Sequence, residues 1–257
     1  MSDVRTEMQG GVLWLTFDRS AARNAMTFEM YDTLKATAER ANADTAVKAL
    51  VITGAGGAFV AGTDISQFAD FKTAEQAYAY EERMDSVLGA LEAVRKPTIA
   101  AIGGATTGGG LAIACACDLR IATSSATFGM PIARTLGNCL SLANLVRISS
   151  LIGLARTKEL IFTARIATSD EALFMGLVSE VVVDEKALAA RATELATTIA
   201  GHAPLTLWAT KEGLRRIRDR MLPDDARDLV ALCYTSEDFR EGVRAFMEKR
   251  KPAWKGK

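Results

Sequence analysis

Histidine is almost missing from this chain, since His202, in GHAPLTLW, is the only one among 257 residues. Its sequence neighbours offer no partner for general-base chemistry, so we interpret His202 as part of a turn that leads into a helix. The cysteines form no Cys-x-x-Cys pair and lie far from the histidine, so no zinc site is predicted. Their mostly apolar surroundings favour reduced core thiols in a cytoplasm. They are Cys115, Cys117, Cys139 and Cys233.

An excess of charge of either sign is also absent, with 31 Lys and Arg against 31 Asp and Glu. This balance removes the global electrostatic argument for binding nucleic acid or a membrane surface. The first ten residues lack a basic region followed by an apolar core, so we expect no signal peptide. With 49% hydrophobic and 24% charged residues, the composition is that of an ordinary globular protein with one large domain, or one domain plus a small appendage.

One apolar run, from Pro97 to Asp118, is long enough to raise the question of a membrane span. Its cluster of glycines and its paired threonines favour a buried strand followed by a buried helix instead. The sequence therefore predicts no membrane partner.

Short apolar runs with helical stretches between them predict an alternation of strands and helices. Thr73 with Gln76, and Thr168 with Glu171, have the spacing of capping boxes at helix starts. From Asp184 onward only helical periodicity is visible, so we expect an α/β fold with a helical C-terminal segment. The predicted strands are 11–17, 47–54, 97–104, 118–123 and 177–183.

Two glycine-rich stretches each follow a predicted strand, GGAFVAGTDISQF (56–68) and GATTGGGLAIACACD (104–118). A strand, a tight loop and a helix start leave backbone N–H groups without partners. Two such sites on neighbouring strands could converge on one developing negative charge, which is the geometry of an oxyanion hole. The second stretch has neither the dinucleotide fingerprint nor the Gly-Lys-Ser/Thr ending of a P-loop. A plain structural turn is the alternative for the first, in which Asp64 caps a helix.

Several stretches together resemble successive motifs of the enoyl-CoA hydratase/isomerase (crotonase) family. They are AFVAGTDI, PTIAAIGGATTGGGLAIACACDLRIAT, ATFGMP, TSDEALFMGLVSEVV and SEDFREGVRAFMEKRKPAWKGK. The resemblance implies an α/β fold with a crotonase-like spiral of ββα units over residues 1–190. It also implies a helical trimerisation segment over residues 191–257, with homotrimers that often pair into hexamers.

The resemblance further implies an acyl-CoA substrate, with coenzyme A as part of the substrate and no separate cofactor or metal. Matched by motif, the backbone N–H groups of Thr63 and Gly109 would hold the thioester oxygen. A backbone contact of this kind leaves the side chain of Thr63 free to vary. Substrate contacts are expected at Arg23, Ala25, Ala61, Gly62, Asp64, Ile65, Ala112, Ile132, Arg134, Asn138, Cys139, Phe246 and Lys249.

Two acids that the family's hydratases use are missing from the matched positions. The first would lie two residues after the glycine run, where this chain has Ala112, and the second follows FGxP, where it has Ile132. Neither side chain can carry a proton. Other family members have an aspartate further along, but the stretch RTLGNCLS (134–141) offers no carboxylate.

That polar stretch allows two interpretations. In one, Arg134, Asn138 and Cys139 line an acyl pocket, and the proton carrier is Cys139 or a distant acid. In the other, the stretch is a structural loop whose Ser141 caps a helix. The distant acids considered are Glu81, Glu82 and Asp85.

Arg23, Phe246 and Lys249 resemble the family's phosphate- and adenine-contacting regions, although a solvated helical charge explains Lys249 equally well. The sequence thus predicts an acyl-CoA-processing enzyme that stabilises a thioester enolate. The alternatives are a hydrolase or isomerase with an atypical base, or a non-catalytic acyl-CoA-binding homologue.

Overall fold

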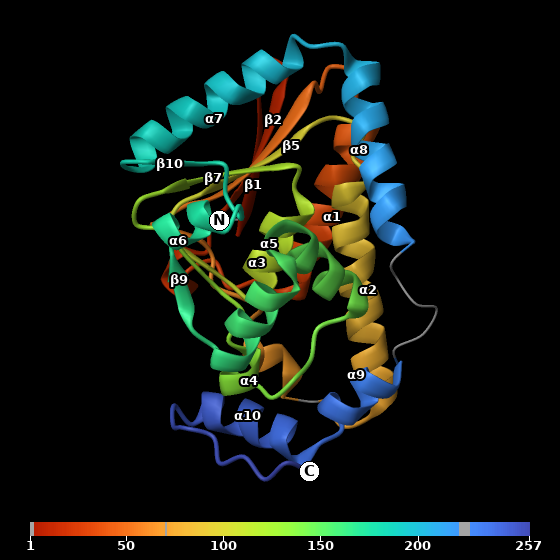
Figure 1. Cartoon of the computed structure of the whole chain (residues 1–257), viewed down its shortest axis with the longest axis vertical. Helices are drawn as coiled ribbons and strands as arrows, with labels where there is room; N and C mark the ends of the chain where they lie inside the picture. The colour runs from red at the N-terminus through yellow and green to blue at the C-terminus, as the bar shows by residue number, and fades with distance from the viewer. Residues whose placement is uncertain (1–2, 70, 221–226) are drawn as a thin grey trace.

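Six strands form the larger of two sheets, which the chain enters through an antiparallel hairpin (Figure 1). The computed structural model describes residues 3–69, 71–220 and 227–257. β1 runs antiparallel to β2, and the other neighbouring pairs of this sheet are parallel. In spatial order the strands are β1 (Val4–Gln9), β2 (Val12–Phe17), β3 (Ala49–Gly54), β5 (Thr98–Ile102), β7 (Leu119–Thr123) and β10 (Glu180–Val182).

The smaller sheet is made of four three-residue strands. Three times in succession, a strand of the large sheet is followed by a strand of the small sheet and then by a helix. The successive groups are β3, β4 and α2, then β5, β6 and α3, then β7, β8 and α4. This repetition confirms the predicted spiral of ββα units. The small strands are β4 (Ala58–Val60), β6 (Ala105–Thr107), β8 (Thr127–Gly129) and β9 (Ile166–Thr168).

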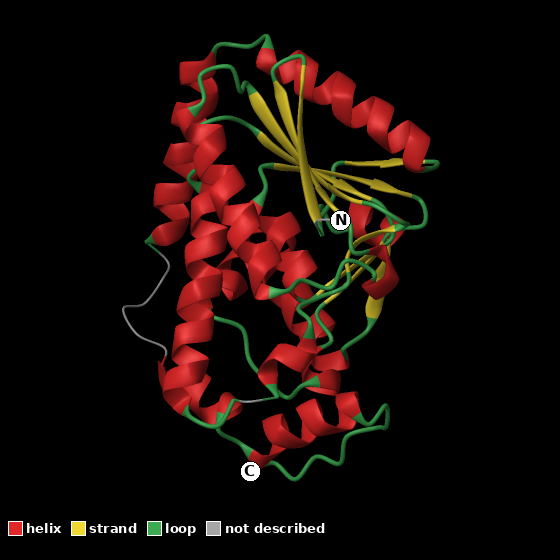
Figure 2. Ribbon diagram, turned by 180° about the vertical axis from the view of Figure 1, so that it is seen from behind, coloured by secondary structure: helices red, strands yellow, loops and turns green. Residues whose placement is uncertain are grey.

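Helices cover both faces of the large sheet (Figure 2). On one face, α7 (Glu185–Ala200) packs Leu188, Ala192 and Ala196 against the sheet. The other face belongs to the main core, which most of the remaining helices share. That core includes residues of α1 (Phe28–Ala43), α2 (Ala74–Glu92), α3 (Gly109–Ala116), α4 (Ile132–Thr135), α5 (Leu142–Thr163) and α6 (Ser169–Phe174).

Local signals in the sequence set the starts of several helices. Both predicted capping boxes are present, at Thr73 for α2 and at Thr168 for α6. Ser141 caps α5 by accepting a hydrogen bond from the N–H of Asn144. Asp64 caps a 3-10 helix, η2 (Ile65–Phe68), where the sequence predicted a helix of unspecified type. The other 3-10 helix is η1 (Ser20–Ala22).

The chain ends in three helices, α8 (Pro204–Asp219), α9 (Arg227–Tyr234) and α10 (Glu237–Met247). α8 lies beside α2, whereas α10 crosses the end of the molecule below α4 and α9 (Figure 1). Helical structure after Asp184 is thereby confirmed for the described residues. The apolar run 97–118 folds into β5, β6 and the eight-residue α3. Across the described ranges, no helix is long and apolar enough to cross a membrane.

Candidate functional site

The three glycines at residues 108–110 are required by their surroundings. Gly108 has φ 54° and ψ −120°, a conformation that residues with a Cβ rarely adopt. A Cβ on Gly110 would lie 2.1 Å from the carbonyl oxygen of Val60, and one on Gly109 would lie 2.2 Å from the hydroxyl of Tyr31. The glycines therefore allow the start of α3 to approach β4 and α1 closely.

This close approach brings the two glycine-rich loops together. Thr107 Oγ1 donates a hydrogen bond to the carbonyl of Ala61 over 2.8 Å. A Cβ on Gly108 would lie only 3.7 Å from the Cα of Gly62. Within the described ranges, neither the N–H of Thr63 nor that of Gly109 has a protein acceptor. Two backbone donors next to each other are thus left for a ligand.

The side chain of Thr63 makes contacts that the sequence did not predict. Its hydroxyl is 2.8 Å from the hydroxyl of Tyr31, on α1, and 3.4 Å from that of Tyr80, on α2. Burial raises the pKa of Tyr31 to about 12 and that of Tyr80 well above its usual value, so both phenols are neutral. Hydroxyl groups on two helices therefore hold the side chain of Thr63 in place, so this side chain is not free to vary as the sequence suggested.

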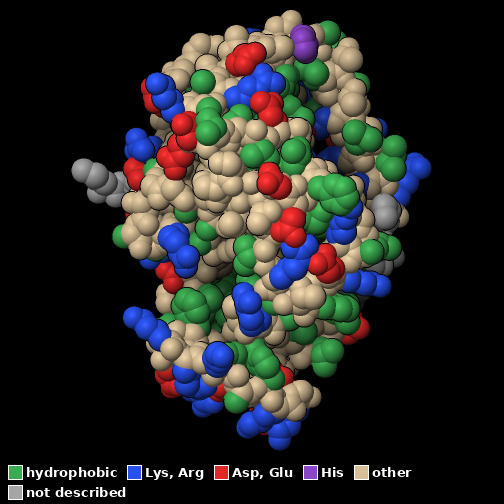
Figure 3. All heavy atoms as spheres, turned by 60° about the vertical axis from the view of Figure 1, so that its left-hand side comes forward, with side chains coloured by type: hydrophobic (Ala, Val, Ile, Leu, Met, Phe, Trp, Pro, Cys, Tyr) green, Lys and Arg blue, Asp and Glu red, His purple; other side chains and the backbone are tan. Residues whose placement is uncertain are grey.

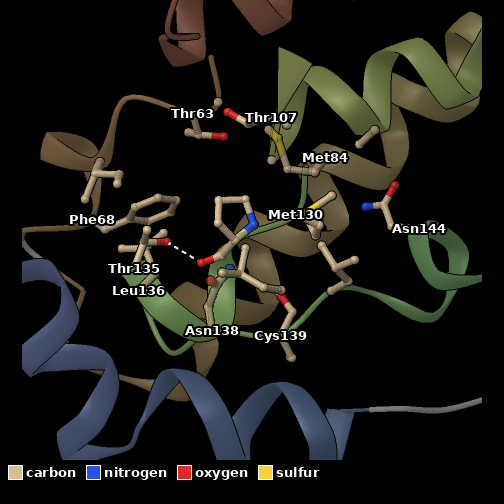
Figure 4. Close-up of a pocket in the computed structure, with 18 of the residues that line it drawn as sticks. Thr63, Phe68, Met84, Thr107, Met130, Thr135, Leu136, Asn138, Cys139 and Asn144 are labelled. Carbon is tan, nitrogen blue, oxygen red and sulfur yellow. Dashed lines mark hydrogen bonds between the residues drawn. The ribbon is translucent and has the colours of Figure 1, made fainter. Parts of the chain in front are cut away.

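A cavity of about 250 Å³ opens in front of these two loops (Figure 4). Its wall is mostly apolar, with a few polar groups, as is usual for small-molecule sites. Besides residues of the two loops, the lining residues include Phe68, Met84, Leu88, Met130, Pro131, Thr135, Leu136, Leu140 and Asn144. Among the residues that the structure describes, no group of three or more His, Cys, Asp or Glu side chains could hold a metal ion.

Most of the predicted contact residues line this one cavity. They are Ala61, Gly62, Thr63, Ile65, Gly109, Ala112, Ile132, Asn138, Cys139 and Phe246. Because these residues come from the loop after β4, from α3, from the α4 region and from α10, only the folded chain brings them together.

The other five predicted contacts do not line the cavity. The side chains of Arg23, Arg134 and Lys249 are exposed, and Ala25 accepts a hydrogen bond from Arg19 through its carbonyl. Asp64 forms an ion pair with Arg19 over 2.8 Å. Burial opposes ionisation of Asp64, but the hydrogen bonds from Ser66 and Arg19 outweigh it and lower its pKa. A structural cap thus accounts for Asp64, and the roles of the other four stay predictions.

The structure supports part of each interpretation of the stretch 134–141. Ser141 caps α5, whereas Asn138 and Cys139 line the cavity. A side-chain hydrogen bond with Cys233 raises the pKa of Cys139, so its thiol is neutral. A neutral thiol is a poor nucleophile, and the structure gives no support to Cys139 as a thiolate.

The three acids proposed as proton carriers have different environments on α2. Glu81 lines the cavity and is only 8% exposed. Glu82 is 67% exposed and pairs with Arg227 on the surface. Asp85 accepts hydrogen bonds from the hydroxyl of Ser141 and from Arg147. Glu81 is the one acidic side chain among the residues that line the cavity.

Charged side chains of both signs mix over the upper part of the face in Figure 3, and Lys and Arg gather at the lower end. That end is formed by α10 and the C-terminal segment (Figure 1). Phe246 of α10 reaches the cavity from there, and Lys249 follows in the exposed segment. Lys and Arg outnumber Asp and Glu in residues 237–257, although several of them pair with Glu237, Glu241 and Glu248, and this excess of positive charge suits a phosphate-bearing ligand.

Comparison with known proteins gives a consistent result. A family profile described as Enoyl-CoA hydratase/isomerase matches residues 7–257. The chain is 35% identical to a short-chain-enoyl-CoA hydratase of Clostridium acetobutylicum, over 98% of this chain and 97% of the relative. It is 33% identical to the 2,3-dehydroadipyl-CoA hydratase of Escherichia coli K12, over the whole of both chains.

Solved structures agree with the sequence relatives. An enoyl-CoA hydratase/carnithine racemase from Magnetospirillum magneticum is 33% identical, with a TM-score of 0.81 over 100% of this chain and 97% of the other. A methylmalonyl-CoA decarboxylase in complex with 2-nitronate-propionyl-CoA is 26% identical, with a TM-score of 0.90 over 100% and 99%. The chain therefore belongs to the enoyl-CoA hydratase/isomerase family.

Proposed function

We propose that this protein is an enzyme that binds an acyl-CoA and stabilises the enolate of its thioester. The observation that carries the proposal is the pair of N–H groups of Thr63 and Gly109, which have no protein acceptor in the described ranges and border one cavity. In an enolate, negative charge moves onto the thioester oxygen. Fixed donors aimed at that oxygen stabilise the charge, and each contributes about 2.7–4 kcal/mol to the transition state.

Family membership supports a CoA thioester as the substrate, because relatives that are 35% and 33% identical are named as hydratases of CoA esters. The basic end of the molecule suits the phosphates of coenzyme A. We expect butyryl-CoA to bind more tightly than butyrate, because the free acid lacks the groups that reach that end. Equal affinities by calorimetry would remove the basis of the substrate assignment.

The proposal is tested by exchange of the α-protons of butyryl-CoA in D₂O, followed by mass spectrometry. Enolate formation exchanges these protons whatever reaction the natural substrate undergoes. We expect enzyme-dependent incorporation of deuterium. Binding of butyryl-CoA without exchange would favour the alternative, a non-catalytic acyl-CoA-binding homologue.

Hydration of crotonyl-CoA is expected to be slow. Ala112 and Ile132, at the positions matched to the family's two glutamates, both line the cavity, and neither carries a proton. A positioned acid or base contributes about 10²–10⁴-fold to a rate. The measurement is the loss of crotonyl-CoA absorbance with the natural protein. A rate typical of fast enzymes would show that the mapping of these two positions is wrong.

A further inference from the structure

One buried acid of the cavity wall has no role in binding the thioester oxygen. Glu81 lies in the middle of α2 and lines the same cavity as Thr63 and Gly109. Burying a carboxyl group costs free energy unless hydrogen bonds or an opposite charge compensate for it. No Lys or Arg is among its hydrogen-bond partners in the described ranges.

A network of neutral groups fixes this carboxyl. The hydroxyl of Tyr234, on α9, donates to Oε1 of Glu81 over 2.5 Å. Asn138 Nδ2 in turn lies 3.2 Å from the hydroxyl oxygen of Tyr234 and donates to it. A backbone hydrogen bond from Ser141 also reaches the carboxyl of Glu81. The helix α9 and the loop 138–141 thus orient one acid at the cavity wall.

We propose that Glu81 is the catalytic acid–base group that removes and returns the α-proton of the acyl-CoA, with Tyr234 as its positioning residue. This inference rests on the proposed enolate chemistry. The carboxylate of Glu81 takes the proton, the C–H electron pair forms the Cα–C double bond, and the carbonyl π electrons move to the oxygen held by Thr63 and Gly109. The reverse step returns a proton, which in D₂O is a deuteron once the carboxyl of Glu81 has exchanged with solvent, so atoms and charge balance with water as the only other participant.

The electrostatic surroundings fit a group that must both take and give a proton. Burial raises the pKa of Glu81 to about 7, and Asp85 on the same helix adds to the rise. The hydrogen bonds from Tyr234 and Ser141 act in the opposite direction. Both protonation states are therefore populated near neutral pH, which is the optimum for general acid–base catalysis.

Among the titratable groups around Glu81, the thiol of Cys233, next to Tyr234 on α9, shares that pH range, because its hydrogen bond with Cys139 lowers its pKa to about 7. The pKa values of the phenols on α1, α2 and α9 and of the thiol in the 138–140 loop all lie above their usual values. Arg147, on α5, is held by Asp85 and Glu92. The groups with raised pKa values are Tyr31, Tyr80, Tyr234 and Cys139.

The test compares Glu81→Gln with Glu82→Gln, its exposed neighbour on the same helix, using butyryl-CoA as the probe. Gln keeps the shape of Glu and accepts the hydrogen bond from Tyr234 but cannot take a proton from carbon. We expect Glu81→Gln to slow α-proton exchange by at least about 10²-fold. Butyryl-CoA affinity by calorimetry should stay within a few-fold of wild type, and Glu82→Gln should exchange at the wild-type rate.

A second variant tests the positioning role through the pH profile. The exchange rate of the wild type should rise with pH to a plateau, with a midpoint near the pKa of Glu81. Tyr234→Phe removes a donor that favours the ionised carboxylate, so its midpoint should move to higher pH. A merely structural tyrosine would lower the rate without moving the midpoint, and that result would overturn its assignment.

The outcomes separate the two proposals. Exchange by Glu81→Gln at the wild-type rate would overturn the role of Glu81 and leave the enolate chemistry standing. Failure of the wild type to exchange bound butyryl-CoA would overturn both. A loss of exchange in Glu81→Gln that is accompanied by lost butyryl-CoA binding would assign Glu81 to binding and contradict the inference.

Discussion

At the scale of single residues, the site depends on backbone positions that side chains must not obstruct. A glycine-rich turn after a strand is a local signal, so the sequence predicted free backbone donors in both loops, and the family resemblance pointed to Thr63 and Gly109 as those donors. Tyr31, Tyr80 and Tyr234 could not be predicted, since each lies on a helix distant in sequence and fits an ordinary apolar stripe. Their hydroxyls acquire a role only when α1, α2 and α9 pack around the cavity.

The first residue-scale prediction concerns Gly109→Ala. The new methyl would lie 2.2 Å from the hydroxyl of Tyr31 and 3.1 Å from Thr63 Oγ1, so both must shift. Because Tyr31 is fully buried, the shift disturbs the donor pair, and we expect α-proton exchange of butyryl-CoA to fall about 10²–10³-fold. Gly213→Ala, where the added Cβ meets nothing within 4 Å, is the matched control. Equal exchange rates in the two variants would argue against the proposed donor pair.

The second residue-scale prediction concerns the stability of the Glu81→Gln variant. The pKa of Glu81 rises from 4.5 to about 7 on folding. A raised pKa means that the folded state binds the proton more tightly, so its stabilisation is complete below pH 4.5 and is lost as pH rises through 7. Glutamine does not titrate. From pH 5 to pH 8 the wild type should therefore lose about 2–3 kcal/mol of unfolding free energy relative to Glu81→Gln.

Urea unfolding of both proteins at equal concentration, at pH 5 and pH 8, measures this difference. The contributions of all other titrating groups to the unfolding free energy are the same in both proteins and cancel when the two are compared. Parallel pH dependence of the two proteins would mean that the carboxyl of Glu81 titrates as in the unfolded chain.

At the scale of elements, the sequence predicted five strands of the large sheet and several helix starts, and missed β1 and the strands of the small sheet. All five predicted strands are present, because runs of apolar residues extend through them. The hairpin strand β1 and the small sheet were not predicted. Three residues cannot display an alternation, and the strands of the small sheet owe their conformation to pairing with one another. The ββα repeat could therefore be predicted from the family resemblance but not from hydrophobic periodicity.

The third prediction concerns the packing of α10 against the cavity wall. A Cβ on Gly242 would lie 2.4 Å from the carbonyl oxygen of Leu136, which lines the cavity just after α4. A backbone carbonyl cannot rotate away, so Gly242→Ala should displace α10 and cost about 1–3 kcal/mol. We also expect weaker butyryl-CoA binding, because Leu136 and Phe246 both contribute to the cavity.

The control is Gly89→Ala in α2, where the added Cβ meets nothing within 4 Å. Replacing a glycine inside a helix should stabilise the protein by about 0.5–1 kcal/mol. Urea unfolding should thus give opposite signs for the two variants. Stabilisation by Gly242→Ala would mean that α10 does not depend on close contact at this position.

At the scale of the whole molecule, one helix is left incompletely covered. In the described chain α8 has no buried residue, although Leu214 and Ile217 project from the same side of it. These side chains are 64% and 65% exposed. Large exposed apolar side chains that share a face indicate an interaction surface. The family resemblance points to a second copy of this chain as the partner.

The last prediction is therefore a trimer-based assembly that uses this face of α8. Light scattering at micromolar concentration should give a mass of about three or six times the 27.5 kDa of one chain. Leu214→Glu with Ile217→Glu should lower that mass, because association would bury two unpaired carboxylates against apolar surface. Arg216→Glu, on the same helix and 72% exposed, adds negative charge away from Leu214 and Ile217 and also removes the ion pair of Arg216 with Glu212. A wild-type mass of 27.5 kDa would contradict assembly, whereas an unchanged mass in the double variant would place the interface on another face.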